Sequence, residues 1–287
     1  MNYRTDLALE MHEKISNKNC LGVEVKKYSK NNVKVTEIKI KDKSGEDAIG
    51  KPIGKYITVE FTEFSHESEI TDERLTILCE NIKSLLPQKY KSVLVVGLGN
   101  ENITPDALGP LCSKQIFATR HLDKEMKVNI GAEKMNYVSS ISTGVLGQTG
   151  IETVEYIKGI VNIVKPDVAI VVDALASSSL SRLGKAVQIT DTGITPGSGV
   201  GNSRAEISEK TLGVPVIAIG VPTVIDGVTM VYDLVKEPKN ISKETEAVIV
   251  TPKDIDIIIE RAAGLIALSI NCAIQPELEP ETFLVLA

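Results

Sequence analysis

Three short runs of apolar residues, separated by segments with helical periodicity, constrain the fold of this chain more than any other feature. The runs cover residues 93–96, 168–172 and 215–219. Strands that are apolar at every position are typically buried on both faces, as in a parallel sheet covered by helices. The intervening helical patterns cover residues 107–119, 151–164 and 205–212. The sequence therefore predicts an α/β fold with a mostly parallel central sheet flanked by helices.

The two ends of the chain add different elements to this core. Residues 20–64 alternate apolar and polar side chains, which predicts an antiparallel β appendage, and residues 71–87 carry a helical apolar face. Apolar residues recur near helical spacing over about 252–272 and predict a C-terminal helix. We expect residues 1–287 to form a single α/β domain that includes both parts.

Charge and motif content argue against two functional classes. The formal net charge is -6 and there is no Trp, so the chain offers neither general attraction to phosphate backbones nor a rich set of base-stacking platforms. The turn Gly97-Leu98-Gly99 begins like a dinucleotide fingerprint, but Asn102 stands where the third glycine belongs. We expect no direct nucleic-acid partner and no cofactor.

The spacing of the cysteines and the lengths of the apolar runs argue against a metal site and a membrane-spanning segment. Cys20, Cys79, Cys112 and Cys272 are scattered without zinc-ligand spacing, which favours buried free thiols and no metal site. Residues 1–10 are too charged for a signal peptide, and the continuous apolar stretches are shorter than the ~20 residues that span a bilayer. We expect a soluble cytoplasmic protein that does not contact a membrane.

Two aspartates follow two of the predicted strands. Asp106 lies in the loop after residues 93–96, and Asp173 directly follows residues 168–172. The carboxyl ends of parallel strands meet at one edge of a sheet, where the functional crevice lies, so we expect the two side chains to be close together. One of two close carboxyl groups keeps its proton near neutral pH while the other acts as a base. The pair predicts an aspartic-type hydrolase; the structural alternatives are a helix N-cap for Asp106 and a loop anchor for Asp173.

Further residues are candidates for supporting this pair or binding substrate. Residues 191–202 are rich in glycine and predict a loop whose backbone N–H groups approach a ligand, with an ordinary long loop as the alternative. His121, which follows residues 107–119, is a candidate for orienting a carboxylate. The alternative is that it interacts with the helix dipole at the end of that helix. The supporting candidates are Gly99, Asn100, Asp191, Gly197, Gly199 and His121.

Six blocks of residues occur in order between residues 97 and 224. They are Gly97-Leu98-Gly99-Asn100 with Thr104-Pro105-Asp106-Ala107-Leu108-Gly109-Pro110; Thr119-Arg120-His121-Leu122; Gly147-Gln148-Thr149-Gly150-Ile151-Glu152-Thr153; Asp173-Ala174-Leu175-Ala176; Asp191-Thr192-Gly193-Ile194 with Pro196-Gly197-Ser198-Gly199-Val200-Gly201-Asn202; and Gly220-Val221-Pro222-Thr223-Val224. Together they resemble the germination proteases of spore-forming bacteria. Arg4-Thr5-Asp6-Leu7-Ala8 and Val250-Thr251-Pro252-Lys253 extend the resemblance over nearly the whole chain. The Gly-x-Gly-Asn loop and the later Asp173 are similar, more distantly, to hydrogenase maturation endopeptidases.

The resemblance implies an endopeptidase that degrades small acid-soluble spore proteins during germination. Such a protein is made as an inactive zymogen in the developing spore, is trimmed at its N-terminus and works as a homotetramer in the cytoplasm of the developing spore or the spore core. The family is regarded as an atypical aspartic protease whose two aspartates match Asp106 and Asp173, with Asp191 as a weaker match. Residues 1–3 alone precede Arg4, whereas family members often carry a longer propeptide.

We therefore expect peptide hydrolysis by a water held between Asp106 and Asp173, one accepting its proton and the other donating a proton to the substrate. Backbone N–H groups of residues 97–100 or 197–201 would stabilise the tetrahedral oxyanion. Two alternatives are a metal-dependent maturation-type endopeptidase that uses the same carboxylates as ligands, and a non-catalytic binder of spore proteins.

Overall fold

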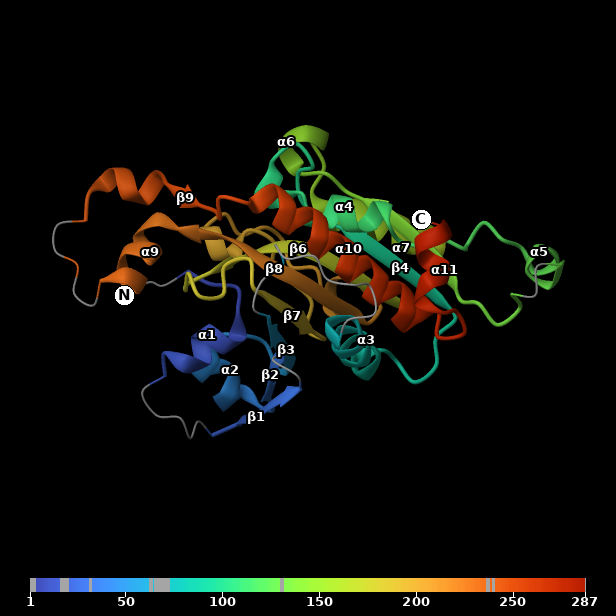
Figure 1. The fold of residues 1–287 in the computed structure, drawn as a ribbon, viewed down its shortest axis with the longest axis horizontal. Coiled ribbons are helices and arrows are strands. Elements are labelled where there is room, and N and C mark those ends of the chain that lie inside the picture. The colour runs from blue at the N-terminus through green and yellow to red at the C-terminus, as the bar shows by residue number, and fades with distance from the viewer. Residues whose placement is uncertain are drawn as a thin grey trace.

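The computed structural model describes residues 4–15, 21–30, 33–61, 64, 73–129, 132–235, 238 and 241–286 (Figure 1). The strands are β1 (Val23–Lys30), β2 (Val33–Ile40), β3 (Gly54–Glu60), β4 (Ser92–Gly97), β5 (Tyr137–Ser142), β6 (Val168–Ser177), β7 (Ala186–Thr190), β8 (Val216–Asp226) and β9 (Ile249–Val250). The α-helices are α1 (Ala8–Glu13), α2 (Lys43–Ile49), α3 (Glu73–Leu85), α4 (Leu108–Lys114), α5 (Lys124–Asn129), α6 (Leu146–Thr149), α7 (Thr153–Val164), α8 (Glu209–Leu212), α9 (Gly227–Leu234), α10 (Ile255–Ile274) and α11 (Pro280–Leu286). Short 3₁₀ helices are η1 (Thr104–Asp106), η2 (Ser198–Val200) and η3 (Lys243–Ala247).

The strands form one mixed sheet in the order β1-β2-β3-β7-β8-β6-β4-β5, with β9 paired to β8. The half formed by β8, β6, β4 and β5 is parallel, and it contains the three apolar runs of the sequence. The other half is antiparallel, from β1 through β7 to β8. The predicted fold class is confirmed. The predicted β appendage is continuous with the central sheet, because β3 pairs with β7 along residues 56–60 and 186–190.

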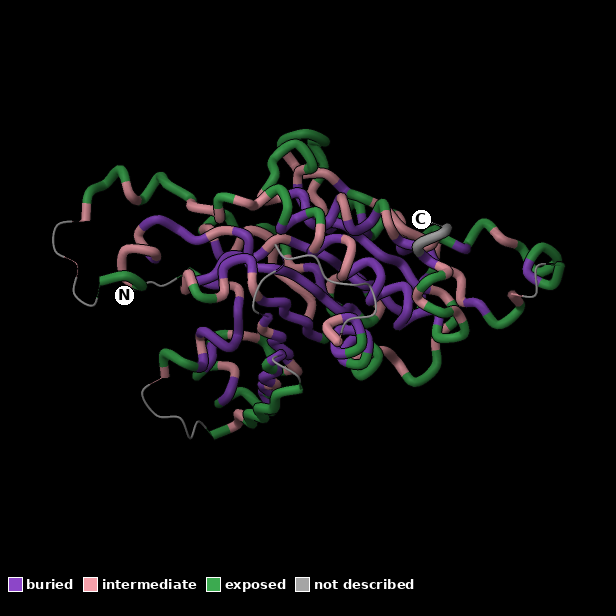
Figure 2. Tube along the Cα trace, viewed as in Figure 1, coloured by how far each residue is buried: buried purple, intermediate pink, exposed green. Residues whose placement is uncertain are grey.

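Helices cover both faces of the parallel half (Figures 1 and 2). Helices α3, α4 and α10 pack on one face, against side chains such as Val95 and Ile170, while α7 and α8 pack on the other, against Leu94 and Val171. Alternate residues of a strand point to opposite faces, so a strand buried on both sides must be apolar throughout. Helix α10 is long and apolar enough to cross a membrane by composition, yet 72% of its most apolar 18-residue window is buried in the protein, as in a core helix.

Two predicted helices are shorter than their apolar patterns. Helix α4 ends at Lys114, and the chain then turns so that the N–H of Thr119 donates to the carbonyl of Val138, 2.9 Å away. Helix α8 starts only at Glu209, because Ile207 is paired with Ile194 in an isolated β-bridge. In both places a contact with a distant segment overrides local helical preference.

Three of the four cysteines lie in the described part of the chain. Cys79, Cys112 and Cys272 are buried free thiols, as expected. Cys20 lies outside the described residues.

Candidate active site

Asp173 lies inside a strand rather than at its end. The ladder between β4 and β6 stops where Gly97 faces Val172, but β6 continues beside β8 to Ser177, with a register shift after Leu175. Asp173 is therefore the first residue of β6 beyond its ladder with β4. The prediction that Asp173 follows the end of its strand is wrong. Because the neighbouring strand β4 ends earlier, β6 is nevertheless open on that side at Asp173, as it would be at a strand end.

Two glycines bring the Asp106 loop close to this opening. A Cβ on Gly97 would lie 2.1 Å from the carbonyl oxygen of Gly109, and a Cβ on Gly109 would lie 2.5 Å from the carbonyl oxygen of Val172. The start of α4 can therefore approach the ends of β4 and β6 only because side chains are absent at both positions. Asp106 lies in η1, just before α4.

The backbone of the preceding loop holds the Asp106 carboxylate. The N–H of Asn100 donates to Oδ2 of Asp106 over 2.7 Å. Gly99 has φ of 110° and its backbone contacts that of Asp106 so closely that a Cβ would lie 2.1 Å from the Asp106 carbonyl oxygen. Glycine is thus required at position 99 because only this backbone conformation lets the N–H of Asn100 donate to the Asp106 carboxylate.

Both aspartates line one cavity of about 600 Å³. The cavity also contains the predicted Gly99, Asn100 and Gly197. It is also lined by segments from several elements, including residues 144–147 after β5, residues 223–224 of β8, and Ile249 of β9. The structure thus brings together the two aspartates and three of the supporting candidates.

The two carboxyl groups differ in their electrostatic surroundings. Burial raises the pKa of Asp173 well above its usual range, and the nearby charges of Asp106 and Asp6 raise it further. Burial also raises the pKa of Asp106, but the N–H of Asn100 opposes this rise by stabilising the ionised form. Asp173 is therefore the group that retains a proton to higher pH, and Asp106 is the group better suited to carry the negative charge.

Asp6 is a third carboxylate in the cavity, and sequence reasoning did not select it. Its backbone N–H donates to the carbonyl of Ala176 (2.9 Å), and its Oδ2 accepts the N–H of Ala176 (2.8 Å). Its Oδ1 accepts the hydroxyl of Ser198 (2.6 Å), and Gly199 packs so closely that a Cβ would lie 2.2 Å from Oδ2. Asp6 belongs to one of the motif blocks, but nothing local in the sequence places it beside Asp173.

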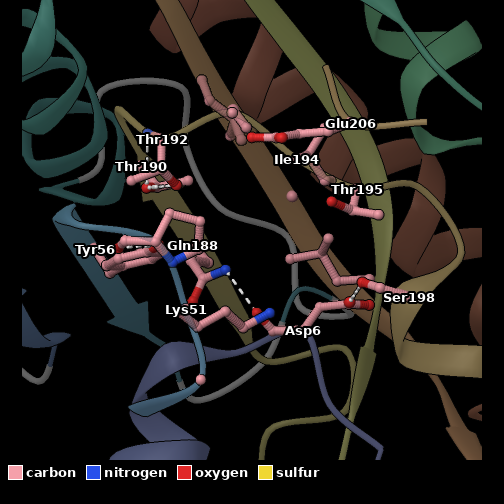
Figure 3. A pocket seen from close by; sticks show the side chains of 17 residues that line it. Asp6, Lys51, Tyr56, Gln188, Thr190, Thr192, Ile194, Thr195, Ser198 and Glu206 are labelled. Atoms are coloured by element: carbon pink, nitrogen blue, oxygen red, sulfur yellow. Dashed lines mark hydrogen bonds between the residues drawn. The ribbon is translucent and has the colours of Figure 1, made fainter. Parts of the chain in front are cut away.

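A second, smaller cavity of about 220 Å³ lies on the other side of Asp6 (Figure 3). Lys51 points into it, and the pKa of Lys51 is lowered by burial, an effect that the charge of Asp6 opposes. Gln188 donates from Nε2 to the Asp6 carbonyl over 3.0 Å. Leu175 lines both cavities, so Asp6 and Leu175 form part of the wall between them.

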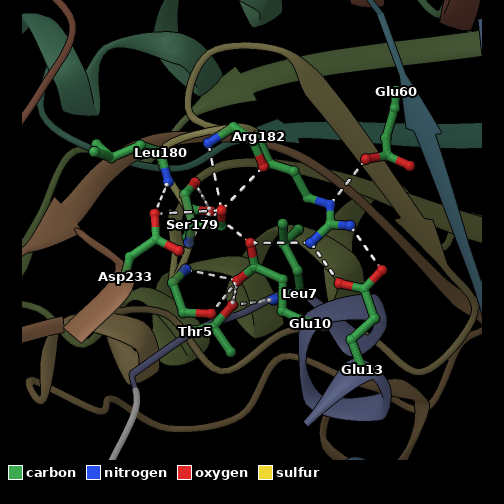
Figure 4. A network of polar contacts seen from close by, with 12 residues as sticks. Thr5, Leu7, Glu10, Glu13, Glu60, Ser179, Leu180, Arg182 and Asp233 are labelled. Carbon is green, nitrogen blue, oxygen red and sulfur yellow. Dashed lines mark hydrogen bonds and ion pairs between the residues drawn. The ribbon is translucent and has the colours of Figure 1, made fainter. Parts of the chain in front are cut away.

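A buried carboxylate fixes the N-terminal segment in this position (Figure 4). Glu10 is 2% exposed and accepts hydrogen bonds from the hydroxyls of Thr5, Ser177 and Ser178. It also accepts the backbone N–H of Ser178 over 2.6 Å, and Arg182 lies 3.8 Å from its Oε1. The end of β6 beyond Asp173 is therefore hydrogen-bonded to residues 5–10.

The remaining predicted residues lie outside the main cavity. Asp191 is exposed and its Oδ1 accepts the N–H of Lys55 over 2.7 Å, so it ties the end of β7 to β3. His121 is exposed in a turn and lines neither cavity. Among the residues that the structure describes, no group of three or more His, Cys, Asp or Glu side chains is arranged to hold a metal ion.

Two further side chains at this site form hydrogen bonds that only their place in the motif blocks could have indicated. The hydroxyl of Thr223 donates to the carbonyl of Pro105 over 2.7 Å and so connects β8 to the Asp106 loop. Gln148 donates from Nε2 to Oδ1 of Asn100, also over 2.7 Å. The available signal was their place in the ordered blocks, because neither residue type in isolation indicates such a role.

Comparison with known proteins agrees with the motif blocks. A family model described as germination protease matches residues 4–244. The germination protease of Caldanaerobacter subterraneus is 45% identical over 308 aligned residues, covering 96% of this chain and 95% of the relative. That of Clostridium tetani is 43% identical and covers 98% of each chain, while that of Bacillus cereus is 43% identical over 75% of this chain and 61% of the relative.

Among solved structures, a NiFe hydrogenase maturation protease from Thermococcus kodakarensis matches with a TM-score of 0.38 and 20% identity, over 66% of this chain and 98% of its own. The family model and the relatives that match over nearly their whole length decide the family. On that basis the chain belongs to the germination protease family of endopeptidases.

Proposed function

We propose that this endopeptidase cleaves peptide bonds with a water held between Asp106 and Asp173. The observation that supports this most directly is that both carboxyl groups line one cavity and that the charge of Asp106 raises the pKa of Asp173. Asp106 is ionised and acts as the base, and Asp173 is protonated and acts as the acid.

The reaction consumes only the peptide bond and one water molecule. Asp106 takes a proton from the water as its oxygen bonds to the scissile carbonyl carbon, and Asp173 gives its proton to the carbonyl oxygen. In the second step Asp106 passes its proton to the amide nitrogen as the C–N bond breaks. Asp173 then recovers a proton from the hydroxyl that becomes the new carbonyl, which restores the starting state.

We further propose that the substrates are small acid-soluble spore proteins and that the enzyme works in the developing spore and the spore core as a homotetramer. The family membership supports both. Sedimentation equilibrium of the purified chain tests the tetramer, and a monomer at working concentration in a form that cleaves substrate would exclude it.

We also propose that the chain is made as a zymogen and trimmed near Asp6. The support is that Asp6 lines the cavity beside Asp173 and that its backbone is hydrogen-bonded to Ala176. Removing the segment would take one negative charge from the neighbourhood of Asp173 and open the wall between the two cavities.

The decisive experiment mixes a purified small acid-soluble spore protein with the full chain and with a chain lacking residues 1–6, and identifies the fragments by mass spectrometry. Asp106→Asn and Asp173→Asn are made in whichever form cleaves. Each is expected to lower kcat by at least about 10²-fold, because general acid–base catalysis supplies gains of that order, while circular dichroism stays unchanged. Full activity in either variant would refute the assignment.

Repeating the cleavage assay in the presence of a chelator separates this mechanism from the metal-dependent alternative. Loss of cleavage in EDTA, with recovery on adding back a divalent cation, would favour metal ligation by the same carboxylates. Binding without fragments in both chain forms would instead favour a non-catalytic spore-protein binder.

A further inference from the structure

The side-chain amide of Asn100 has a fixed orientation. Its Oδ1 accepts the backbone N–H of Asn102 over 3.0 Å and the Nε2 of Gln148 over 2.7 Å. A backbone N–H can only donate, so the atom of Asn100 that faces it must be the oxygen rather than the nitrogen. The atom of Gln148 that faces the same oxygen must then be its nitrogen.

This orientation leaves the Nδ2 group of Asn100 with two N–H donors to offer. In the described part of the chain Nδ2 makes no hydrogen bond, and it is not among the side-chain atoms sealed from solvent without a partner. Asn100 lines the main cavity, and its own backbone N–H is bonded to Asp106. The free donors therefore belong to a residue anchored directly on the Asp106 carboxylate.

Most backbone N–H groups that were expected to serve an oxyanion are already used. In the first loop, the N–H of Leu98 donates to Val172 and that of Asn100 to Asp106. In the second loop, the N–H groups of Ser198, Val200, Gly201 and Asn202 donate within the loop itself. A donor already satisfied by the protein has little to give to a developing negative charge.

We propose that the side-chain amide of Asn100 donates to the oxygen of the tetrahedral intermediate, and that Gln148 is a positioning residue that holds this amide in its donating orientation. The inference rests on the proposed function and adds to it a specific electrophilic group. Asn100 is predicted to act mainly on the transition state, because partial negative charge builds up on the carbonyl oxygen only as water attacks the carbonyl carbon, before the proton of Asp173 is fully transferred to that oxygen.

The first test is Asn100→Asp, assayed with a purified small acid-soluble spore protein in the chain form that cleaves it. The aspartate can keep both hydrogen bonds to Oδ1 while losing the two donors. Removing one oxyanion donor typically lowers kcat by about 10²- to 10³-fold, and we expect a loss of that order with KM changed less than about threefold. A kcat within about threefold of the parent would overturn the proposal.

The second test concerns Gln148. Gln148→Met keeps the length of the side chain but removes the donor. We expect kcat to fall by roughly tenfold with little change in KM, because that pattern marks the loss of an interaction made only in the transition state. Gln148→Lys supplies a donor again and should recover most of this loss.

A double-mutant cycle decides whether Gln148 acts through Asn100. In the Asn100→Asp background, Gln148→Met should lower kcat by less than about twofold, since the donors that Gln148 positions are gone. An equal loss in both backgrounds would overturn the positioning role.

The same assay separates this inference from the proposed function. If the carboxylate mechanism is wrong, Asp106→Asn and Asp173→Asn retain kcat. If only the inference is wrong, those two variants are inactive while Asn100→Asp remains active. Thermal unfolding of each variant shows whether a loss of kcat reflects a loss of fold.

Discussion

At the scale of single residues, Asp173 is a carboxyl group whose burial costs stability at neutral pH. Its pKa in the folded protein lies well above the usual value for an aspartate, because burial and the charges of Asp106 and Asp6 disfavour its ionised form. The folded state therefore keeps a proton that the unfolded state releases. Stability contributed by this group is present below about pH 3.9 and is lost as pH rises from there to the folded-state pKa.

Replacing this carboxyl group should consequently stabilise the protein as it inactivates it. Asp173→Asn is expected to raise the free energy of unfolding by at least about 1 kcal/mol at pH 7, with the gain shrinking towards pH 4. Its Oδ1 can still accept the N–H of Ala174, so that hydrogen bond is not lost. Urea unfolding at both pH values measures the difference. A variant less stable than the parent at pH 7 would mean that the carboxyl group has a favourable partner in the fold.

The residues of the site differ in how far the sequence could reveal them. Asp106 and Asp173 were predicted to meet because each follows an apolar run and parallel strands share an edge. Asp6 and Gln148 were not selected, because their roles depend on contacts across 170 and 48 positions of sequence. No local pattern encodes such contacts, and polar side chains on loops carry no periodicity that would mark them.

At the scale of elements, the close approach of α4 to the strand ends depends on Gly109. A Cβ at position 109 would lie 2.3 Å from the carbonyl oxygen and 2.4 Å from the nitrogen of Leu98. Both are backbone atoms, which can move only if the chain around them moves too. We expect Gly109→Ala to lower the free energy of unfolding by about 3 kcal/mol, typical of overpacking, and to lower kcat because the Asp106 loop is displaced.

Gly159→Ala is the matched control for this change. Gly159 lies within α7, and a Cβ there would meet nothing within 4 Å. Alanine should stabilise that helix by about 0.5–1 kcal/mol through lower backbone entropy in the unfolded state. Equal effects of the two substitutions in chemical denaturation would show that helix propensity, and not the contact with Leu98, determines the result.

The elements that the sequence predicted best are those with strong apolar patterns. Strands β4, β6 and β8 are buried along almost their whole length, and helices α3, α7 and α10 each bury an apolar face. Strand β5 was missed because it reads Tyr-Val-Ser-Ser-Ile-Ser at the edge of the sheet, where polar residues are tolerated. Strand β7 was missed because it is short and carries Gln188, whose side chain bonds the N-terminal segment through the N–H of Ala8 and the carbonyl of Asp6.

At the scale of the whole molecule, the N-terminal segment connects the two halves of the sheet. Ala8 and Leu9 pack with Ile38 and Tyr56 of the antiparallel half. Asp6 and Glu10 are hydrogen-bonded to Ala176 and Ser177 of β6 in the parallel half, three and four residues after Asp173. Sequence periodicity predicted both halves, but their connection is set by long-range pairing that no local signal specifies. Loss of these hydrogen bonds to β6 should therefore loosen the strand beside Asp173 as well as the N-terminal segment.

Glu10 and Glu13 allow that connection to be tested, because both carboxylates face Arg182 but only one is buried. Glu10→Gln keeps the shape of the side chain but replaces one carboxylate oxygen with an NH₂ group. That group cannot accept the hydrogen bonds that the carboxylate accepts from donors such as the N–H and hydroxyl of Ser178, and Arg182 would lose a charged neighbour. We expect a loss of about 3 kcal/mol in the free energy of unfolding, and faster hydrogen exchange over residues 4–15 and 174–178. The Glu13 side chain is 41% exposed, so Glu13→Gln should cost less than about 1 kcal/mol and leave exchange at 174–178 unchanged. If the two variants behaved alike, the coupling would belong to Arg182 in general, and the buried carboxylate would not be what holds the N-terminal segment against the strand that carries Asp173.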